Sequence, residues 1–417
     1  MGVPIAFAIG ISSLGVIVME GRLPVTIVIS KMFAGMDSFP LMAIPFFVLT
    51  GTLANASGLT ERIIALANAV VGHRIRAGLA HVNIVASMIF GGISGSVVAD
   101  SSAMGSILIP GMTKVGFHKD YSVAVTATSS TIGALIPPSI VMIIYGFQAQ
   151  QSIGRLFLGG AIPGILVGLA LMMVAHIIAV RRGYHFTTEN KGKTYLQEFW
   201  EAFRHSGLAL MIPVIIIGGI VGGVFTPTEA GVVAAASVFL IGGVVYRSLT
   251  WSLIEDAFVD AAVTTTVVML ILGVSAIFAN ILTRAYFQTE MLHLLGALGA
   301  DRMVQLFIVM GFLFFLGFFI DVTPIIIMFG ASLAALGIQL GFDPIHFGVV
   351  IVMTTLIGAV TPPVGVLLIL NCGIAGIRLS ESFRVLWPFV GALLFVCVLS
   401  ALVPETVLFL PRLLFGG

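Results

Sequence analysis

Two stretches of this sequence carry the residue types that could bind ions inside an otherwise apolar chain. The first, Gly91–Tyr145, reads GGISGSVVADSSAMG near its start, includes Asp100 and contains a Pro-Pro pair. The second, Leu316–Asn371, includes Asp321 and also contains a Pro-Pro pair. Carboxylates, hydroxyl groups and backbone carbonyls freed from a helix suit a desolvated Na⁺, while freed N–H groups at a helix start suit a carboxylate. The residue types therefore predict binding of a cation and an organic anion.

The two stretches are copies of one another. Gly133 and Gly358 are 225 residues apart, as are Pro137 and Pro362. In all, seven residues of the first copy recur, unchanged, 225 positions later in the second. They are Gly116, Phe117, Ile132, Gly133, Ala134, Pro137 and Pro138. Seven identities in one register indicate an internal duplication.

The composition predicts an integral membrane protein. Hydrophobic residues make up 59% of the 417 residues and charged residues only 9%. Several charge-free intervals reach the length of about 20 residues that a membrane-spanning helix needs. The net charge of +1 argues against a nucleic-acid partner. Both cysteines lie in apolar segments, so we expect no disulfide framework and no transition-metal site.

A basic, hydrophilic segment separates the two copies. Residues 181–206 contain Arg181, Arg182, Lys191, Lys193 and Arg204, and the positive-inside bias places this segment in the cytoplasm. We expect a first repeat over 1–180 and a second over 207–417. Within them we expect re-entrant hairpins at 91–113 and 317–340 and broken helices at 121–147 and 345–376.

Broken helices and hairpins inside a membrane indicate a binding site. Unpaired backbone groups cost several kcal/mol in hydrocarbon, so non-helical backbone is tolerated only where protein or water surrounds it. Each Pro-Pro pair removes two successive backbone donors, and we expect Gly133 and Gly358 to let the chain open there. Two such devices are typical of a secondary transporter with its site at the midplane, and we take inverted topology of the halves as a hypothesis.

The two aspartates need separate interpretations. A carboxylate at membrane depth costs roughly 2.5–3.5 kcal/mol on insertion scales, which favours a role in binding. Asp100 could instead cap the second helix of its hairpin, because Ala-Asp-Ser-Ser is also a plausible helix start. Asp100 and Asp321 do not share the register of the repeat, so the duplication does not assign them equivalent roles.

Several motifs together resemble one known family. GGISGSVVADSSAMGSILIPGM, TIGALIPPSIVMIIYG, FTPTEAG, the DVTP beginning at Asp321, DPIHFGVV and IGAVTPPVG are similar to the large membrane subunit of tripartite ATP-independent periplasmic (TRAP) transporters, of the dicarboxylate-permease type. The resemblance covers nearly the whole chain from Gly2. The family usually has further apolar residues before that point. We therefore expect either that the first helix of this chain is short or that the start of the sequence has been placed late.

The resemblance implies a fold, a function and partners. The fold would be an all-α polytopic membrane protein with two inverted repeats, forming an elevator-type transport domain and a scaffold. The protein would lie in a bacterial or archaeal inner membrane and import an organic acid, such as a C4-dicarboxylate, by symport with Na⁺. Its partners would be a small four-helix membrane subunit and a soluble periplasmic substrate-binding protein.

The resemblance also implies site residues. The first sodium region would comprise Ser94, Gly95, Ser96 and Gly133, and the second Asp321, Thr323, Gly358 and Thr361. The substrate would lie near Ser96, Ser129, Pro138, Ser139 and Thr354.

Two other functions remain open at this point. One is a stand-alone carboxylate carrier, coupled to Na⁺ or H⁺, that needs no binding protein. The other is a membrane enzyme, which is weakly supported because no His, Cys, Asp or Glu set has the spacing of a metal site or a catalytic triad.

Overall fold

The described part of the chain is helical throughout. The computed structural model describes residues 4–21, 24–72, 77–184, 195–297, 299 and 301–416, and no strand occurs within those ranges. Within them, seven helices are long and apolar enough to cross a membrane. The prediction of an all-helical, multi-pass membrane protein is confirmed.

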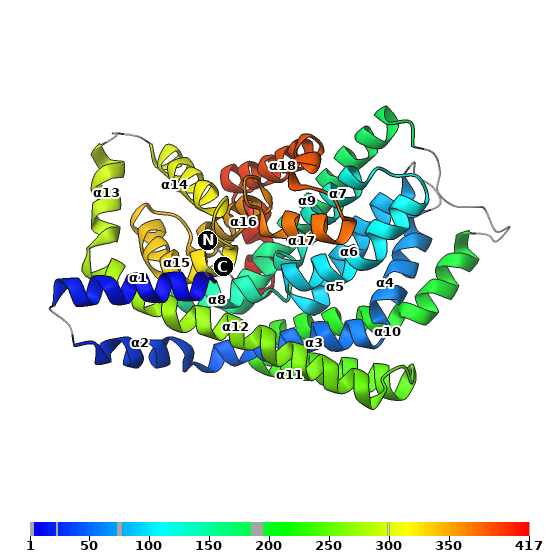
Figure 1. The fold of residues 1–417 in the computed structure, drawn as a ribbon, viewed down its shortest axis with the longest axis horizontal. Coiled ribbons are helices and arrows are strands. Elements are labelled where there is room, and N and C mark those ends of the chain that lie inside the picture. Colours follow the sequence, from blue (N-terminus) through cyan, green and yellow to red (C-terminus); the bar gives the residue numbers. More distant parts are fainter. Residues whose placement is uncertain are drawn as a thin grey trace.

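One group of helices forms a layer that Figure 1 shows along the lower edge of the molecule. Helix α12, 34 residues long, packs against α1, α2 and α3, and α11 packs against α3. Helices α4, α10 and α13 flank this layer. The helices of this group are α1 (Ile5–Glu20), α2 (Thr26–Met36), η1 (Phe39–Met42), α3 (Ala43–Ala56), α4 (Leu59–Ala67), η2 (Asn68–Gly72), α10 (Tyr195–Val221), α11 (Pro227–Leu240), η4 (Ile241–Val245), α12 (Trp251–Arg284) and α13 (Phe287–Ala297).

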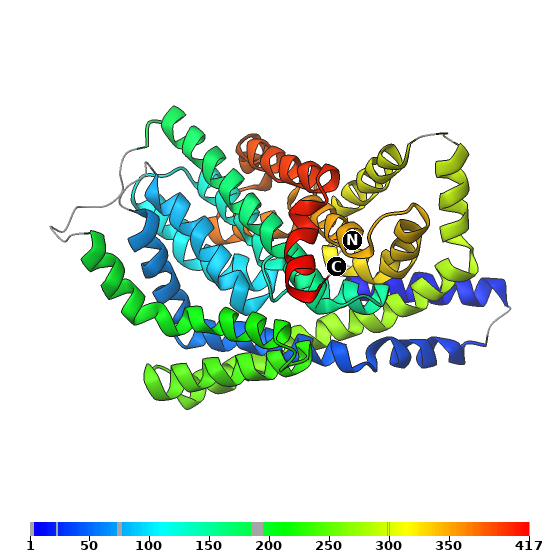
Figure 2. The ribbon, with the colours of Figure 1, turned by 180° about the vertical axis from the view of Figure 1, so that it is seen from behind.

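The remaining helices follow the same order in each half of the chain: a hairpin, an interrupted helix and a long helix. In the first half these are α5 (Gly78–Ser94), α6 (Val97–Lys114), α7 (Lys119–Ser129), η3 (Ser130–Ala134), α8 (Ile140–Ala149) and α9 (Ile153–Arg181). In the second half they are α14 (Arg302–Gly317), α15 (Val322–Gln339), α16 (Pro344–Val360), α17 (Val366–Ala375) and α18 (Leu379–Leu402), followed by α19 (Glu405–Phe415). Figure 2 shows α19 beside α9, with which it packs.

Both interruptions lie where the Pro-Pro pairs predict them, at 135–139 and 361–365. Both Pro-Pro bonds are cis. The hairpins are longer than the stretches 91–113 and 317–340, because α5 begins at Gly78 and α14 at Arg302. The early glycines of the first stretch lie inside α5, and the helix ends only at Gly95, which has a left-handed backbone conformation.

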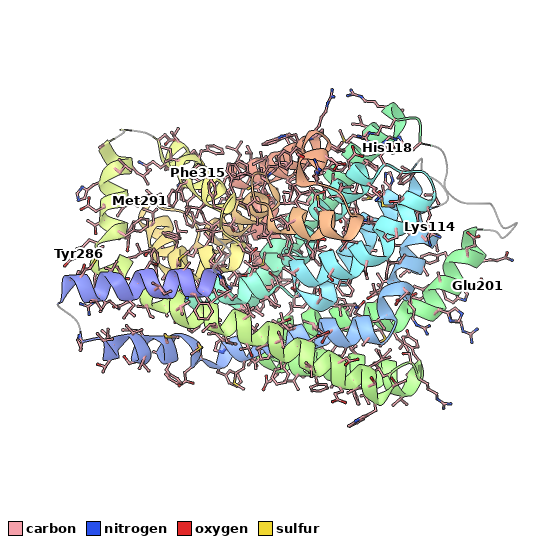
Figure 3. All side chains as sticks on the ribbon, in the orientation of Figure 1. Lys114, His118, Glu201, Tyr286, Met291 and Phe315 are labelled. Atoms are coloured by element: carbon pink, nitrogen blue, oxygen red, sulfur yellow. The ribbon has the colours of Figure 1, made fainter. Side chains whose placement is uncertain are left out.

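The two hairpins enter the molecule from opposite ends. Figure 3 shows Lys114 and His118, at the base of the first hairpin, at one end of the molecule, and Met291, just before the second hairpin, near the other. The halves also interlock, because α8 packs against α15 and α17 packs against α6. Each interrupted helix therefore supports the hairpin of the other half.

An ion pair ties the base of α7 to the end of α9. Arg182 donates two hydrogen bonds to the carboxylate of Asp120, at 2.9 and 2.8 Å. Burial alone would raise the pKa of Asp120, but the Arg182 guanidinium, with the Tyr121 backbone N–H, lowers the pKa below its usual value. Arg182 is the second residue of the expected cytoplasmic connector; Lys191 and Lys193 of that connector lie outside the described residues.

Candidate functional site

The tip of the first hairpin is fastened to the first interrupted helix. Gly95, with φ of 62°, ends α5, and its carbonyl accepts a hydrogen bond of 3.0 Å from the N–H of Ile140, the first residue of α8. A Cβ at Gly95 would lie 2.8 Å from the carbonyl oxygen of Pro138. Only glycine combines this backbone conformation with so close an approach. The tip and the interruption therefore form one structural unit.

Two serines organise the helix starts of this unit. Ser96 is the N-cap of α6 and accepts a hydrogen bond of 3.3 Å from the N–H of Ala99. Ser139 is the N-cap of α8, accepting from Met142 N–H at 3.2 Å and donating to the Ala134 carbonyl at 2.6 Å. The starts of α6 and α8 lie close together, because Gly95 precedes Ser96 and its carbonyl accepts the Ile140 N–H. Helix starts suit a bound anion.

Glycines allow each hairpin to touch the interrupted helix of its own half. A Cβ on Gly91 would lie 2.5 Å from the Cα of Gly133, and a Cβ on Gly317 would lie 2.6 Å from the Cα of Gly358. The prediction that Gly358 lets the chain open is wrong, because α16 continues through it to Val360. At Gly133 the chain is a 3₁₀ helix that ends one residue later. Both glycines serve close backbone packing.

Asp100 is buried beside the contact between Gly91 and Gly133. It lies in the first turn of α6, and a Cβ at Gly133 would be 3.6 Å from its Cβ. Neither carboxylate oxygen forms a hydrogen bond of 3.5 Å or less among the described residues, although the hydroxyls of Ser87 and Ser130 lie near the carboxylate. The capping interpretation is wrong, because Ser96 is the N-cap of this helix. A fully buried carboxylate without a partner is costly, and a cation would offset that cost.

The second hairpin places its carboxylate differently. Asp321 is the N-cap residue of α15 and makes no side-chain capping bond; the residue is partly exposed, but its carboxyl group lies within the packed protein. It occupies the position of Ser96 in the first hairpin, 225 residues earlier, whereas Asp100 has the buried Ile325 as its counterpart. Thr323 follows in the first turn of α15 and is also half-buried. The two tips therefore hold their carboxylates at different positions of the helix start.

The second interruption begins at Thr361. This buried residue ends α16, donating its N–H to the Gly358 carbonyl at 3.0 Å and its hydroxyl to the Ile357 carbonyl at 2.6 Å. Gly365, with φ of 52°, then precedes α17. Gly358 and Thr361, both expected near sodium, thus lie one helical turn apart.

Ser129 and Thr354, expected near the substrate, are buried within packed helices. Ser129 donates to the side-chain oxygen of Asn83 at 3.3 Å. The Thr354 hydroxyl donates to the Val350 carbonyl at 2.8 Å and lies 3.4 Å from the sulfur of Cys397. The structure therefore does not bring these two hydroxyls into one open space with Ser96.

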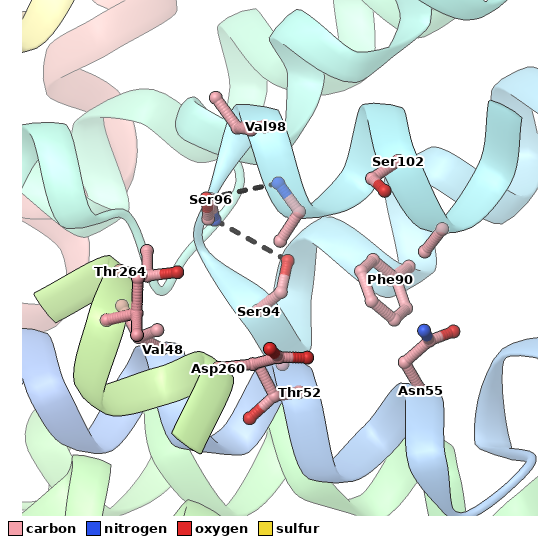
Figure 4. Close-up of a pocket in the computed structure, with 14 residues that line it drawn as sticks. Val48, Thr52, Asn55, Phe90, Ser94, Ser96, Val98, Ser102, Asp260 and Thr264 are labelled. Carbon is pink, nitrogen blue, oxygen red and sulfur yellow. Dashed lines mark hydrogen bonds between the residues drawn. The ribbon is translucent and has the colours of Figure 1, made fainter. Parts of the chain in front are cut away.

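An open cavity of about 300 Å³ lies instead between the first hairpin and helices α3 and α12 (Figure 4). Its polar lining residues include Ser94, Ser96, Thr52, Asn55, Asp260 and Thr264. Sequence reasoning identified the two serines and missed the other four. One signal in the sequence could have pointed to Asp260. It is the last charged residue before a long charge-free interval of the same helix.

Within the described residues, no group of three or more His, Cys, Asp and Glu side chains could hold a metal ion. Oxygen groups at the hairpin tips and interruptions are the ligands that the site offers. Hydroxyls, backbone carbonyls and carboxylates suit hard cations rather than transition metals.

The fold is that of a multi-pass membrane transporter. A solved structure of the YdaH transporter of Alcanivorax borkumensis, described as having an unusual topology, matches it with a TM-score of 0.63 at 13% identity, covering 90% of this chain and 88% of that one. Residues 1–406 match the family model "Tripartite ATP-independent periplasmic transporter, DctM component". The chain belongs to this family.

Relatives across the family are similar over nearly the whole chain. The sialic acid TRAP transporter large permease protein SiaM of Vibrio cholerae is 36% identical over 415 residues, which is 100% of this chain and 96% of the relative. The isethionate TRAP transporter permease protein DctMQ of Oleidesulfovibrio alaskensis is 38% identical over 410 residues, which is 98% of this chain but 64% of the relative. The prediction of a TRAP large permease is confirmed, and family membership implies an inner-membrane transporter subunit.

Proposed function

We propose that this protein is the permease of a Na⁺-driven importer of an organic acid, working with a small four-helix membrane subunit and a periplasmic substrate-binding protein. Family membership implies both partners. The observation that carries the proposal is the fastened unit formed by the Gly95 tip and the interruption before Ile140, next to the buried, unpartnered carboxylate of Asp100.

The first sodium region in this proposal surrounds that unit. Ser94, Gly95, Ser96 and Gly133 supply hydroxyl and carbonyl oxygens, and Asp100 supplies the negative charge that balances the cation. Na⁺ bound there would fasten the hairpin tip more firmly to the start of α8. Cation binding would therefore complete the adjacent anion site before the substrate arrives.

The second sodium region lies at the other hairpin. Asp321 and Thr323 contribute from the start of α15, and Gly358 and Thr361 from the end of α16. Asp321 lies at the N-cap of its helix, whereas Asp100 lies one turn inside α6, so the two regions are not equivalent.

The substrate in this proposal contacts the hairpin tip directly through Ser96. Pro138 and Ser139 shape the adjacent interruption, while the buried Ser129 and Thr354 support the helices behind it. The hairpins, interrupted helices, α9 and α18 would move as a transport domain against a scaffold that contains α3, α11 and α12. The opposed hairpins support alternating access of the elevator type.

The test is reconstitution of the system in liposomes. A labelled organic acid is first chosen by its ability to stabilise the partner binding protein against thermal unfolding. We expect uptake driven by an inward Na⁺ gradient when all three components are present, and no uptake with K⁺ in place of Na⁺. Equal uptake by this chain alone would refute the tripartite proposal and support a stand-alone carrier.

A single substitution tests the second sodium region. Asp321→Asn keeps the size of the side chain and removes its charge, so we expect Na⁺ stimulation of uptake to fall while thermal unfolding changes little. Unchanged Na⁺ dependence in this variant would remove Asp321 from the site. Asp301→Asn is a matched control, because Asp301 is the exposed N-cap residue of α14 in the same hairpin.

A further inference from the structure

The cavity between the first hairpin and helices α3 and α12 carries a charge that the proposed sodium regions do not explain. Asp260 of α12 lines this cavity together with Ser94 and Ser96 of the hairpin tip (Figure 4). Among the described lining residues, Asp260 alone is charged. No described residue forms an ion pair or hydrogen bond with its carboxylate. Asp260 is exposed, so the cavity carries one carboxylate that no described side chain pairs with.

The opposite wall of the cavity is rich in hydrogen-bond donors. At the hairpin tip, Ser94 Oγ accepts from the Ser96 N–H at 3.5 Å and Ser96 Oγ accepts from the Ala99 N–H at 3.3 Å, so both hydroxyl hydrogens remain available to a ligand. Helix α6 also starts there. A helix start attracts anionic groups. The cavity is thus polarised, with a donor wall suited to an acidic group and an acceptor wall, at Asp260, suited to hydroxyl, amide or ammonium groups.

Two polar side chains of the lower layer also line the cavity. Thr264 lies one turn after Asp260 on α12, and Asn55 lies on α3. Asn55 already accepts a hydrogen bond of 3.3 Å from Thr60 through its side-chain oxygen, which leaves the amide nitrogen as a donor. The volume of about 300 Å³ is at the lower end of that of small-molecule sites. It accommodates a compact polar ligand.

We infer that this cavity is the substrate site in the described conformation, and that it takes an organic anion with one acidic group and several hydrogen-bond donors at its other end. The inference rests on the proposed transport function and names its substrate class. The acidic group lies against Ser94, Ser96 and the start of α6. The donor-rich end lies against Asp260.

Asp260 also discriminates against dicarboxylates. A second carboxylate at the far end of the substrate would face a like charge, and the described lining offers no cation to offset the repulsion. A site that accepts hydrogen bonds from a ligand rejects analogues lacking the donors, because its own polar groups are then left unpaired. Asp260 is therefore a specificity residue that acts both by attraction and by repulsion.

The first experiment measures the charge of the cavity without any substrate. Thr264 is exposed, and both native cysteines are buried, so a Thr264→Cys variant of the complex of this chain with its small subunit offers one accessible thiol in the cavity. We expect a cationic methanethiosulfonate reagent to react at least about tenfold faster than an anionic one of similar size. Adding Asp260→Asn should remove most of this difference.

A matched control uses Asp256, which lies one turn earlier on the same helix, is exposed and does not line the cavity. Asp256→Asn should leave the rate ratio unchanged. A thiol that does not react, or a ratio that Asp260→Asn leaves unchanged, would overturn the cavity assignment.

The second experiment measures ligand choice. The same two-subunit complex, without a binding protein, is titrated in Na⁺ with gluconate, a monoacid with five hydroxyl groups, and with succinate, a dicarboxylate, by thermal shift. We expect gluconate to bind at least about tenfold more tightly, and Asp260→Asn to reduce this preference by about tenfold, which corresponds to about 1.4 kcal/mol. Asp256→Asn should keep the preference.

The outcomes separate the inference from the function it rests on. Equal or tighter binding of succinate, absence of gluconate binding, or a preference that Asp260→Asn leaves unchanged would overturn the inference, even if Na⁺-driven uptake is observed in liposomes. Gluconate preference that is lost in Asp260→Asn but does not depend on Na⁺ would support the cavity assignment and contradict Na⁺ coupling.

Discussion

Alanine should have different effects at Gly91 and at Gly133, although the two glycines are in contact. A Cβ added to Gly91 would lie 2.5 Å from the Cα of Gly133, whereas a Cβ added to Gly133 would lie 3.5 Å from the Cα of Gly91. Carbon atoms in contact normally lie about 3.5–4.0 Å apart. Gly91→Ala therefore requires the backbones to separate by about 1 Å, and Gly133→Ala requires almost no movement.

The energies follow from these distances. Overpacking a close contact typically costs about 1–3 kcal/mol, and here the neighbour is backbone that cannot rotate away. Alanine in place of a helical glycine would otherwise gain about 0.5–1 kcal/mol. We expect Gly91→Ala to destabilise the protein by about 2 kcal/mol, within that range, and Gly133→Ala to stay within about 1 kcal/mol of wild type.

Thermal unfolding of the complex with the small subunit, followed by intrinsic fluorescence in detergent, measures the difference. The second half provides an internal control, because Gly317 and Gly358 each place a Cβ within 2.7 Å of the other's Cα, so alanine at either position should destabilise. Gly133→Ala as damaging as Gly91→Ala, or Gly91→Ala without effect, would show that close backbone packing is not the reason for these glycines.

Three further substitutions test the site and its support. Gly95→Ala forces a residue with a side chain into a left-handed backbone conformation, which alone costs about 1–2 kcal/mol, and it places a Cβ 2.8 Å from the Pro138 oxygen. We expect a lower unfolding temperature and loss of uptake. Wild-type uptake would contradict the attachment of the hairpin tip to the interrupted helix. Asp100→Asn removes a buried charge without a partner, so we expect equal or higher thermal stability together with weaker Na⁺ stimulation of uptake; a large loss of stability would indicate a structural role instead. Because the pKa of Asp120 is lowered by Arg182 in the folded protein, its contribution is present above the unfolded pKa of about 3.9 and is lost as pH falls through the lower folded value. Asp120→Asn should therefore reduce stability by about 1 kcal/mol at pH 7 and make acid unfolding less steep, whereas equal losses at pH 7 and below pH 3 would exclude the ion pair.

The sequence alone was sufficient for every feature that depends on local chain chemistry. Long apolar intervals require a membrane, and a Pro-Pro pair interrupts a helix in any surroundings because it removes backbone donors. The 225-residue register therefore located both interruptions correctly. The same motifs identified the family. The spacing of their glycines and prolines reflects where the backbone must turn or open.

The sequence misjudged features that depend on which helices meet. It assigned Gly358 to chain opening, although the residue lies inside α16 and packs against Gly317. It left a capping role open for Asp100, although Ser96 caps the helix. Glycine in a helix has the same signature whether it serves flexibility or close approach, and only the neighbouring helix distinguishes the two.

The candidate cavity is the clearest case of a feature that the tertiary structure alone decided. Asn55, Ser96 and Asp260 line it from three helices that are far apart in the chain. None of them has a sequence neighbour that predicts the other two, because the position of α12 against α3 and the hairpin is set by packing over whole helix surfaces. The sequence predicted that backbone and carboxylate groups would lie within the membrane; the packing of distant helices determined which of those groups share a space.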